Sequence, residues 1–392
     1  MIKDQYDLVI VGGGPGGSMA ALHAAKNGIS VCLLEKTRDI GYPVRCGEAM
    51  GETAIGQFFK PKDTWIAARI KKCRIIAPNG TELNIPFKKE KGYVLNRRIF
   101  DYDLSLMASE AGAEIYTKSY VKSIEKKNDT YNLNFDYLGQ PKMIKSRIII
   151  GADGVDSRVG RWAGIKTQVK MKDMESCIQY SVGNVDIDKN QMDMYVGRIH
   201  APGGYLWVFP KGDGFANIGI GVSGKYSKEK SAKRYLDEFI EKKYSAATIH
   251  TTMCGGVPCA KPLSRPIADS LMLVGDAAHF VNPLTGGGIA GAMKSGMFAG
   301  KIASEAIKAD DTTERFLQKY INLCNKDFAS RHNKIYRVKE TIQKFTDDEM
   351  NHIADKVTQI PADKITLGKV FTTAVLKKPS MIIDVMRMFA GF

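Results

Sequence analysis

The chain has 392 residues, of which 44% are hydrophobic and 25% charged, an ordinary composition for a globular protein of two or three domains. No stretch approaches the roughly 18 to 20 apolar residues that span a bilayer, and the first predicted strand begins too close to Met1 for a signal peptide, so we expect an intracellular protein. Its 57 basic and 42 acidic residues give a net charge of +15, which favours a membrane surface or a phosphate-bearing substrate, or serves solubility alone. No nucleic-acid-binding motif accompanies this charge, so we expect no nucleic-acid partner.

The chain opens on a strand, a glycine-rich turn and a helix. Residues 6–11 are mostly apolar, Gly12, Gly14 and Gly17 hold the spacing G-x-G-x-x-G, and residues 18–26 have a helical pattern. Gly12 would permit the tight turn, Gly14 would let a pyrophosphate approach the backbone, and Gly17 would let the helix pack closely on the strand. The phosphates would bind at the helix N-terminus, where unpaired N–H groups attract anions.

An acidic residue at the end of the second predicted strand completes this unit. The strand covers residues 30–34, and Glu35 follows it, 18 residues after Gly17. A carboxylate at this place accepts hydrogen bonds from ribose hydroxyls and repels a 2′-phosphate. The first 36 residues therefore predict a site for the ADP half of FAD or NAD rather than NADP. A solvated acidic strand end is the alternative.

The remaining elements alternate between extended and helical patterns. Further strands are predicted at residues 70–77, 81–85, 93–95, 114–116, 120–126, 131–137, 143–150 and 271–274, with several antiparallel strands between 175 and 222. Helices are predicted at residues 97–110, 228–243 and 289–308, and the segment 312–392 is helical by pattern and basic in patches. The strands near residues 7, 31, 114, 146 and 271 are expected to form one interrupted parallel sheet.

Two later strand ends favour FAD over NAD. Gly151-Ala152-Asp153-Gly154 follows one predicted parallel strand, and Gly275-Asp276 follows another, 240 residues after Glu35. A carboxylate such as that of Asp276 can accept from two hydroxyls of a polyol chain. FAD contains such a chain in its ribityl group and NAD does not.

These motifs together resemble those of a flavoprotein superfamily. Residues 151–157 and 275–289 are similar to the FAD-binding signatures of the p-hydroxybenzoate-hydroxylase-like flavoproteins. Arg97, with Phe100 and Asp101 after it, fits the R-x-x-F-D pattern of that superfamily, whose arginine approaches the FAD pyrophosphate; the adjacent Arg98 is an alternative. The resemblance implies that the helix beginning at residue 289 faces the flavin pyrimidine, because a helix N-terminus stabilises the negative charge of reduced flavin.

A motif in the middle of the chain narrows the resemblance to one family. Residues 202–210, P-G-G-Y-L-W-V-F-P, match the P-x-x-Y-x-W-x-F-P pattern of the geranylgeranyl reductase family, and residues 45–48, R-C-G-E, resemble the loop that this family places beside the isoalloxazine. Tyr205, Trp207 and Phe209 would share one face of a strand. The resemblance implies a wall for a polyprenyl chain, and plain core packing is the alternative.

The resemblance also implies a set of site residues. Cys46, Tyr205 and Trp207 are the catalytic candidates, although Cys46 could also be a small buried hydrophobe. The substrate candidates are Tyr205, Trp207 and Phe209. The cofactor-binding candidates are Gly12, Gly14, Pro15, Gly17, Glu35, Lys36, Arg45, Cys46, Gly47, Arg97, Asp153, Gly154, Gly275, Asp276, Pro283, Gly286, Gly287, Gly288 and Ile289. No metal site is predicted, because the histidines and cysteines lack ligand spacing; Cys254 and Cys259 either pair or stay isolated thiols, the latter being favoured.

The activity implied by the resemblance is FAD-dependent reduction of isolated C=C bonds in geranylgeranyl chains of archaeal-type ether phospholipids, with hydride from N5 of reduced flavin. The proton donor stays open between Cys46, Tyr205 and an ordered water, and the electron donor between NAD(P)H and a ferredoxin-like protein. A flavin monooxygenase or halogenase of the same fold, a quinone-linked electron-transfer flavoprotein, and a non-enzymatic basic membrane or nucleic-acid binder that keeps FAD for structure are the alternatives.

The predicted fold class is α/β, or α+β for the whole chain. A Rossmann-like FAD-binding domain (residues 1–65, 97–165 and 266–310) is combined with an antiparallel-sheet substrate domain (66–96 and 166–265) and a helical C-terminal region (311–392). We expect a cytoplasmic monomer. Residues 365–376 and 381–392 combine apolar helical faces with basic residues, which indicates packing on the body or peripheral attachment to the inner face of the cell membrane.

Overall fold

The computed structural model describes residues 2–87, 91–361, 365, 366, 370 and 373. It divides the chain into two compact units. The first unit comprises Met1–Val44, Arg97–Val169 and Ala260–Asn333, and the second comprises Arg45–Asn96, Lys170–Cys259 and Lys334–Phe392. These units begin and end at other residues than the predicted domains, since residues 45–65 and those after 333 belong to the second unit. The predicted domain boundaries stay a prediction.

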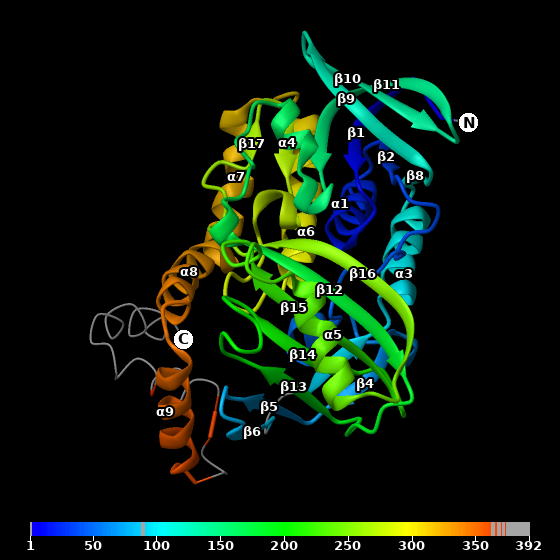
Figure 1. Cartoon of the computed structure of the whole chain (residues 1–392). Helices are drawn as coiled ribbons and strands as arrows, with labels where there is room; N and C mark the ends of the chain where they lie inside the picture. Colours follow the sequence, from blue (N-terminus) through cyan, green and yellow to red (C-terminus); the bar gives the residue numbers. More distant parts are fainter. Residues whose placement is uncertain (1, 88–90, 362–364, 367–369, 371–372, 374–392) are drawn as a thin grey trace. The chain divides into compact units, whose positions relative to one another are not determined.

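An eight-stranded sheet forms the centre of the first unit (Figure 1). Along its main path the strands are β17 (Ile267–Ala268), β18 (Leu271–Leu273), β11 (Gln140–Gly151), β1 (Gln5–Val11), β2 (Val31–Leu34) and β8 (Glu114–Tyr116). All neighbours on this path except β17 and β18 are parallel. The strand β11 also pairs antiparallel with β10 (Thr130–Tyr137), which pairs with β9 (Ser119–Lys127). The predicted interrupted parallel sheet of the strands near residues 7, 31, 114, 146 and 271 is therefore confirmed.

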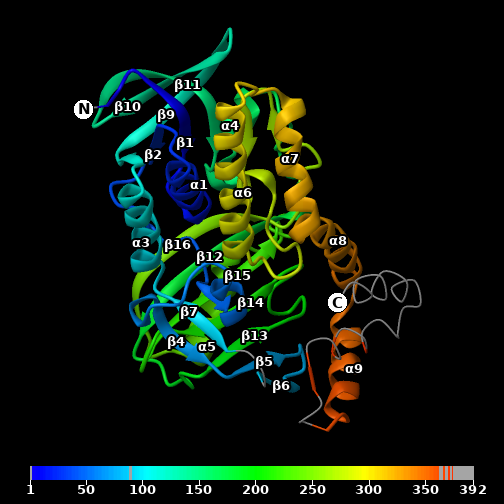
Figure 2. The ribbon, with the colours of Figure 1, turned by 180° about the vertical axis from the view of Figure 1, so that it is seen from behind.

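Two helices pack closely in this unit. Helices α1 (Pro15–Lys26) and α6 (Ile289–Lys308) lie side by side (Figure 1 and Figure 2). A Cβ on Gly296 would lie 2.1 Å from the carbonyl oxygen of Gly16, and one on Gly300 would lie 2.4 Å from that of Ala20. The small residues of α6 thus let two backbones approach each other. The other helices of the unit are α3 (Arg97–Glu110), α4 (Arg158–Trp162), α7 (Glu314–Cys324) and the π-helical turn at Asn325–Ala329.

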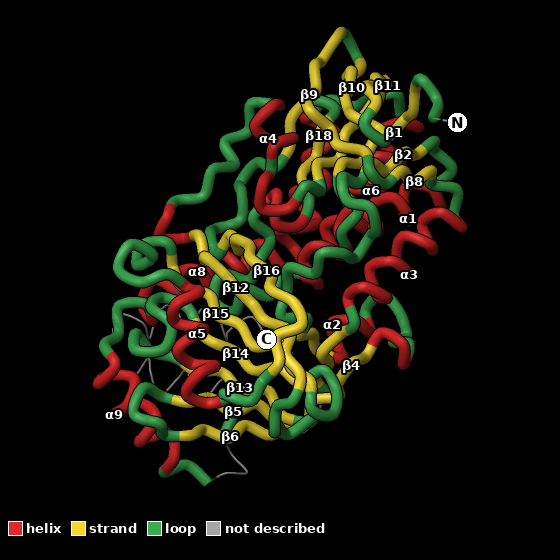
Figure 3. Tube along the Cα trace, turned by 45° about the vertical axis from the view of Figure 1, so that its right-hand side comes forward, coloured by secondary structure: helices red, strands yellow, loops and turns green. Residues whose placement is uncertain are grey.

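A seven-stranded sheet forms the centre of the second unit (Figure 3). Its strands in spatial order are β16 (Thr248–Pro258), β12 (Met174–Gly183), β15 (Phe215–Ser223), β14 (Tyr205–Pro210), β13 (Gln191–Tyr195), β5 (Lys72–Ile76) and β6 (Glu82–Pro86). Only β13 and β5 pair in parallel among these neighbours. Leu236 and Ile240 of α5 (Ala232–Lys243) complete an apolar core on one face.

The opposite face of the same sheet packs against a smaller one. Strands β3 (Ala49–Gly51), β7 (Gly92–Leu95) and β4 (Ile66–Ile70) form this three-stranded sheet. Ala68, Ile70 and Val94 cluster with Trp207 and Phe209 of β14. The second unit therefore has an apolar layer on each face of its larger sheet, and the antiparallel substrate region that the sequence predicts is confirmed as a fold.

Several elements differ from the sequence-based expectation. Helix α5 begins at Ala232 rather than at residue 228, because the Ser231 side chain caps it by accepting from the N–H of Arg234. Strand β16 was not predicted, because most of its residues are exposed and no alternating apolar pattern marks it. The helical segment after residue 312 is confirmed by α7, α8 (Ser330–Ile342) and α9 (Asp347–Thr358), and α2 (Glu52–Gly56) is an additional short helix.

The segments 365–376 and 381–392 lie outside the described residues, apart from Ile365, Thr366, Val370 and Thr373. In the part of the chain that is described, no helix combines the length and the hydropathy that crossing a bilayer requires. Cys254 and Cys259 are not joined by a disulfide, so the favoured interpretation of these two residues is confirmed.

Candidate functional site

The glycine turn lies at the carboxyl end of β1. Gly12 has a φ of +108°, and a Cβ there would lie 2.3 Å from the carbonyl oxygen of Ala152. A Cβ on Gly17 would lie 1.9 Å from the carbonyl oxygen of Gly12. A Cβ on Gly14, by contrast, would meet no atom within 4 Å. Two of these glycines are thus required by the fold itself, while the third faces open space at the N-terminus of α1.

Glu35 fixes the backbone beside this opening. Its Oε2 accepts from the N–H of Gly13 at 2.7 Å, and its Oε1 accepts from the N–H and the hydroxyl of Thr37 at 2.8 and 2.7 Å. The neighbouring Lys36 is exposed and pairs with Asp156, 3.3 Å away. The carboxylate of Glu35 therefore lies at the end of β2 next to the start of α1, and its Oε2 has a further lone pair for a ribose hydroxyl.

Asp153 follows the neighbouring strand β11. Its Oδ2 accepts from the N–H of Val159 at 3.0 Å, whereas its Oδ1 is buried and has no partner among the described residues. Loss of solvation raises the pKa of this carboxyl above its ordinary value, because burial disfavours the charged form. A buried acceptor without a donor is costly. This oxygen therefore suits a ligand that brings a hydroxyl or an N–H group to the carboxyl end of β11.

Asp276 lies after β18, in the turn Gly275–Ala278, and faces the start of α6. A Cβ on Gly288, the N-terminal cap of α6, would lie 3.1 Å from its Oδ1. Desolvation raises the pKa of Asp276 to about 6, and the charge of Arg97 opposes this shift. Arg97 itself donates through Nε and Nη2 to both carboxylate oxygens of Asp101, at 2.6 Å each. This corner of the first unit thus combines the carboxyl group of Asp276, whose pKa is raised, with the guanidinium of Arg97, which Asp101 holds, and the N-terminus of α6.

In the second unit, the three aromatic side chains of β14 share one face, as predicted. The ring centroids of Tyr205 and Trp207 are 5.8 Å apart, and those of Trp207 and Phe209 are 6.2 Å apart. Trp207 and Phe209 are only 8% and 6% exposed, whereas Tyr205 is partly buried. These two rings are therefore also part of the core, and the role of the strand as a ligand wall stays a prediction.

The loop of residues 45–48 is attached to this aromatic face by Gln179. The amide of Gln179 donates to the carbonyl oxygen of Cys46 at 3.1 Å and accepts from the indole N–H of Trp207 at 3.0 Å. A Cβ on Gly47 would lie 3.0 Å from the ring of Phe209. The loop therefore lies directly on the aromatic face, held by one buried amide.

Glu48 anchors the other end of that loop. Its side chain is buried, and its Oε2 accepts from Lys211 at 2.7 Å and from the amide of Asn217 at 2.5 Å. Its own N–H donates to the Sγ of Cys46 at 3.2 Å. Because the ion pair is buried, removing either partner would leave an uncompensated charge, so the loop has one defined conformation.

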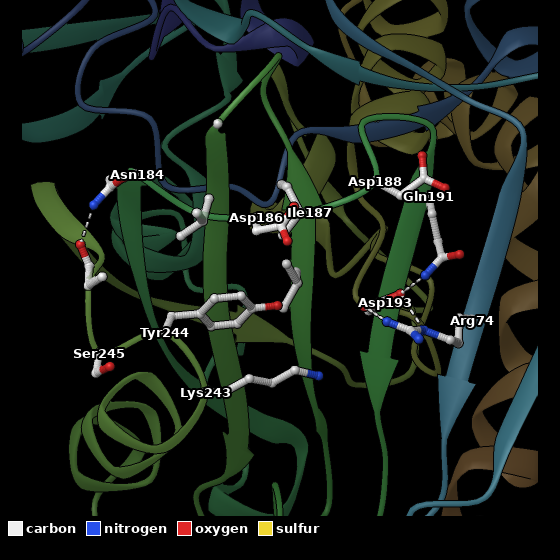
Figure 4. A pocket seen from close by; sticks show the side chains of 14 residues that line it. Arg74, Asn184, Asp186, Ile187, Asp188, Gln191, Asp193, Lys243, Tyr244 and Ser245 are labelled. Atoms are coloured by element: carbon white, nitrogen blue, oxygen red, sulfur yellow. Dashed lines mark hydrogen bonds and ion pairs between the residues drawn. The ribbon is translucent and has the colours of Figure 1, made fainter.

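A separate pocket of about 850 Å³ opens in the second unit (Figure 4). Arg74 donates to both carboxylate oxygens of Asp193 at 3.0 and 2.5 Å, and Gln191 donates to the same carboxylate at 2.6 Å. Lys243, on another wall, contacts the hydroxyl of Tyr195. Charged groups that already pair with one another line this pocket, which suits a polar ligand rather than a long hydrocarbon chain.

Comparison with known proteins shows the family to which the chain belongs. Two family models match the chain, FAD dependent oxidoreductase over residues 7–203 and geranylgeranyl reductase catalytic domain over residues 173–257. A protein of Methanococcoides burtonii named digeranylgeranylglycerophospholipid reductase 1 is 43% identical over 370 residues, which cover 93% of this chain and 91% of the relative. The chain belongs to the geranylgeranyl reductase family. It is thus an FAD-dependent oxidoreductase by family, and its cofactor is FAD.

Solved structures of geranylgeranyl reductase type share this fold. A geranylgeranyl bacteriochlorophyll reductase-like protein from Thermoplasma acidophilum has a TM-score of 0.91 and 35% identity, and the match covers 98% of this chain and all of that one. A triple mutant of the flavin-dependent brominase Bmp2 has a TM-score of 0.72 at 18% identity, covering 96% and 100% of the two chains. The predicted fold class is confirmed, and the likeness to the brominase concerns the fold alone.

The site residues predicted for this geranylgeranyl reductase family member fall into two groups. The second unit holds Arg45, Cys46, Gly47, Tyr205, Trp207 and Phe209. The first unit holds Gly12, Gly14, Pro15, Gly17, Glu35, Lys36, Arg97, Asp153, Gly154, Gly275, Asp276, Pro283, Gly286, Gly287, Gly288 and Ile289. The roles of the individual residues stay predictions.

The first unit fits FAD on structural grounds. Open space lies in front of Gly14, where a pyrophosphate would approach, and α1 and α6 both begin in this region of the unit. The unpartnered Oδ1 of Asp153 and the carboxylate of Asp276 offer acceptors for cofactor hydroxyls. These features match a ligand with phosphates, a ribose and a polyol chain.

Sequence reasoning missed Gln179 and Glu48 as supports of the geranylgeranyl reductase loop. Glu48 was visible as the last residue of R-C-G-E, and a charged residue inside such a motif was a usable signal. Gln179 gave no such signal, because it shares its side of the strand with other polar residues, Glu175 and Ser181. Their partners, Asn217 and Trp207, lie far along the chain, so the contacts themselves were not predictable.

Proposed function

We propose that this protein is an FAD-dependent reductase of isolated C=C bonds in the geranylgeranyl chains of archaeal-type ether phospholipids. The observation that carries the proposal is the aromatic strand β14 joined through Gln179 to the loop of residues 45–48. This arrangement occurs in a chain that is 43% identical, over 93% of its length, to a protein named for this activity. The constellation combines an apolar wall with a fixed polar loop, which suits a hydrocarbon substrate.

In the first unit, the residues of the chain bind and orient the cofactor. Bound FAD, when reduced, supplies the hydride for the reaction. The backbone at Gly14 and the N-terminus of α1 would hold the pyrophosphate, and Glu35 would accept from the ribose hydroxyls. Asp276 would accept from the ribityl chain, and the N-terminus of α6 would face the pyrimidine ring and stabilise negative charge there.

In the second unit, the residues of the chain would bind the alkene and exclude water. An isolated C=C bond is unactivated, so proton delivery must be closely coupled to hydride transfer. Trp207 and Phe209 provide buried apolar surface, and the buried ion pair of Glu48 and Lys211 holds the loop in place. Cys46 lies at the centre of this loop, and Tyr205 is the least buried of the three aromatic residues.

Further features belong to the same proposal. The electron donor would be NAD(P)H or a ferredoxin-like protein, and an acidic ferredoxin would be attracted by the net charge of +15. The protein would act as a cytoplasmic monomer, with peripheral attachment to the membrane that contains its polyprenyl lipid substrate. Anaerobic titration of the oxidised holoenzyme with each donor would distinguish the two electron sources.

The direct test is a defined reduction. FAD-loaded protein is reduced chemically under anaerobic conditions and mixed with a digeranylgeranylglycerophospholipid, and the products are analysed by mass spectrometry. We expect the lipid to gain two hydrogens for each bond reduced and the flavin absorbance to recover in step. Chemical reductant without protein is the control. A lipid that stays unsaturated while the flavin stays reduced would exclude the proposed function.

A further inference from the structure

A buried ion pair lies at the end of β12 in the second unit. Lys339 of α8 is 3% exposed, and its Nζ donates to Asp173 Oδ1 at 3.1 Å and to the carbonyl oxygen of Cys259 at 2.7 Å. The hydroxyl of Tyr336 donates to the same carboxylate at 2.9 and 3.1 Å. Asp173 and Lys339 therefore compensate each other's charge inside the protein.

Glu175 lies two residues farther on and has no such compensation. It is 7% exposed, and its Oε2 is buried without a hydrogen-bond partner among the described residues. The cation that acts on it is Lys339, which is already bound to Asp173, and the Asp173 carboxylate acts against it. Desolvation is the largest effect and raises the pKa of Glu175 to about 8. The side chain therefore holds a proton at neutral pH.

The strand register places Glu175 on the same face as the aromatic residues of β14. Cys177 on β12 and Tyr205 on β14 both lie opposite Gly221 of β15. Two residues farther along each of these strands, Gln179 and Trp207 both lie opposite Gly219. Side chains that are two residues apart on a strand share a face, so Glu175 belongs to this row as well.

The glycines of this region bring backbone close to the carboxyl group. A Cβ on Gly204 would lie 3.0 Å from the Oε2 of Glu175, and one on Gly221 would lie 4.0 Å from it. The Sγ of Cys177 lies nearby, since the Cβ on Gly221 would lie 3.3 Å from it. The unpartnered oxygen is therefore next to Gly204, the residue before Tyr205 at the start of the aromatic strand.

We propose that Glu175 is the acid that supplies the proton for reduction of the C=C bond. This inference rests on the proposed function. The alkene gains at one carbon the hydride that the reduced flavin supplies, and at the other carbon the proton of the Glu175 carboxyl group, whose O–H bond breaks. The alkene is reduced by the two electrons of that hydride, and Glu175 is left as a carboxylate near Lys339, to regain its proton from water.

Tyr205 and Cys177 on this face hold their protons more tightly than Glu175. Burial raises the pKa of Tyr205 and of the Cys177 thiol well above their ordinary values. The titratable groups that act on Glu175 or are acted on by it are Asp173, Cys177, Tyr205 and Lys339. The Cys46 thiol also lies on this face, so a transition near pH 8 is assigned to Glu175 by its loss in Glu175→Gln.

The first experiment needs no substrate. Infrared difference spectra of the FAD-loaded protein in its resting form are compared between wild type, Glu175→Gln and Asp237→Asn. Asp237 is the control, because it is a carboxylate of α5 that accepts from Tyr180, on the other face of β12. We expect a band of a protonated carboxylic acid in wild type that disappears as the pH rises through about 8, is absent in Glu175→Gln, and persists in Asp237→Asn. A wild-type protein without this band at neutral pH would overturn the inference.

The second experiment follows a single turnover of chemically reduced enzyme with the lipid. We expect Glu175→Gln to slow C=C reduction by about 100-fold or more, as loss of a general acid does. The wild-type rate should fall as the pH rises through about 8, the residual rate of Glu175→Gln should not depend on pH, and Glu175→Asp should recover part of the rate. Unchanged FAD content and melting temperature show that the variants are folded.

The outcomes separate the two proposals. If wild type reduces the lipid and Glu175→Gln does so equally fast, the inference about Glu175 is wrong and the proposed function stands. If wild type fails to reduce the lipid although the infrared band titrates as expected, the proposed function is wrong while the protonated state of Glu175 is established.

Discussion

Gly14 and Gly17 are three residues apart and have opposite steric surroundings. A Cβ on Gly17 would overlap the carbonyl oxygen of Gly12, whereas one on Gly14 would enter open space. We expect Gly17→Ala to destabilise the protein by about 3 kcal/mol or more, because a fixed backbone must shift. Gly14→Ala should change the free energy of unfolding by less than about 1 kcal/mol, as expected at a helix cap. It should nevertheless weaken FAD binding at least tenfold, about 1.4 kcal/mol.

Urea unfolding of the flavin-free protein and fluorescence titration with FAD measure these two effects separately. Wild-type FAD affinity in Gly14→Ala would mean that the pyrophosphate does not approach this position. Wild-type stability in Gly17→Ala would mean that the packing of α1 on β1 can relax, which the 1.9 Å contact makes unfavourable.

Asp276 predicts a pH dependence of FAD binding. In the protein without cofactor, its pKa is raised to about 6. Hydroxyl groups that donate to the carboxylate favour its ionised form, so the pKa in the complex would be lower. FAD affinity should therefore be constant above pH 6 and fall by up to about tenfold per pH unit below it. Asp276→Asn should bind FAD more weakly at neutral pH and lose this dependence.

Equilibrium dialysis of FAD between pH 5 and pH 8 would measure the effect, because this range includes the Asp276 pKa of about 6. Asp153→Asn is the companion variant, because the pKa of Asp153 is also raised by burial. An affinity of wild type that does not change with pH would contradict a role for Asp276 as an acceptor from the cofactor.

At the scale of elements, β15 acts as a spacer between the polar residues of β12 and the rings of β14. A Cβ on Gly219 would lie 2.4 Å from Cζ2 of Trp207 and 2.9 Å from the carbonyl oxygen of Ile178. We expect Gly219→Ala to displace the indole and break its hydrogen bond to Gln179. The cost should be about 1 to 3 kcal/mol of the free energy of unfolding, with a larger loss of activity.

Gly255→Ala is the matched control for this prediction. Gly255 lies on β16 of the same sheet, and a Cβ there would lie 3.6 Å from the Arg45 side chain, an ordinary contact. Urea unfolding monitored by circular dichroism gives the stability, and the shift of tryptophan emission gives the change around the indole. Equal stability losses in both variants would show that the room which Gly219 leaves for the Trp207 indole is not what makes this position sensitive.

Elements with a strong local pattern could be predicted from the sequence. Helices α3 and α6 begin and end where the sequence indicated, and β1 and α1 follow from the apolar run and the glycine turn. Strand β16 could not be predicted, because it gains its place from pairing with β12 while its own side chains are mostly exposed. The strand is defined by its neighbour rather than by its own composition.

The residues of the candidate site likewise divide into those that the sequence could predict and those that it could not. Gly12, Glu35 and Asp276 could be found, because each lies at a strand end within a short motif. Glu175 and Gln179 could not, because their surroundings arise from register across β12, β15 and β14, which no local pattern specifies. Long-range pairing thus determines which polar residues of a strand become buried and face the aromatic side chains.

At the scale of the whole molecule, buried titratable groups change the pH dependence of stability in two opposite directions. His23 and His332 have pKa values lowered to about 4, because burial disfavours the charged imidazolium. Glu175 has a pKa raised to about 8, because burial disfavours the carboxylate. Acid therefore destabilises the protein through these histidines, and mild alkali destabilises it through Glu175.

The direction of each effect follows from proton binding. Between pH 6.5 and 4, the unfolded chain binds more protons at the histidines than the folded one, so stability falls as the pH falls. Between pH 4.5 and 8, the folded protein binds the proton of Glu175 more tightly, so its contribution to stability is lost as the pH rises. Asp276 acts in the same direction as Glu175 between pH 3.8 and 6, which partly offsets the histidines.

These shifts predict a stability profile that a single variant should change. Above pH 6.5 the histidines no longer contribute, so the free energy of unfolding of flavin-free wild type should decline toward pH 8 by roughly 1.4 kcal/mol per pH unit. Glu175→Gln should lack this decline, because the amide has no proton to lose. His332→Asn should instead reduce the loss of stability below pH 6.5 and leave the alkaline decline unchanged. Urea unfolding across this range would decide the matter, and a wild-type curve that is flat above pH 6.5 would mean that Glu175 is ionised in the folded protein.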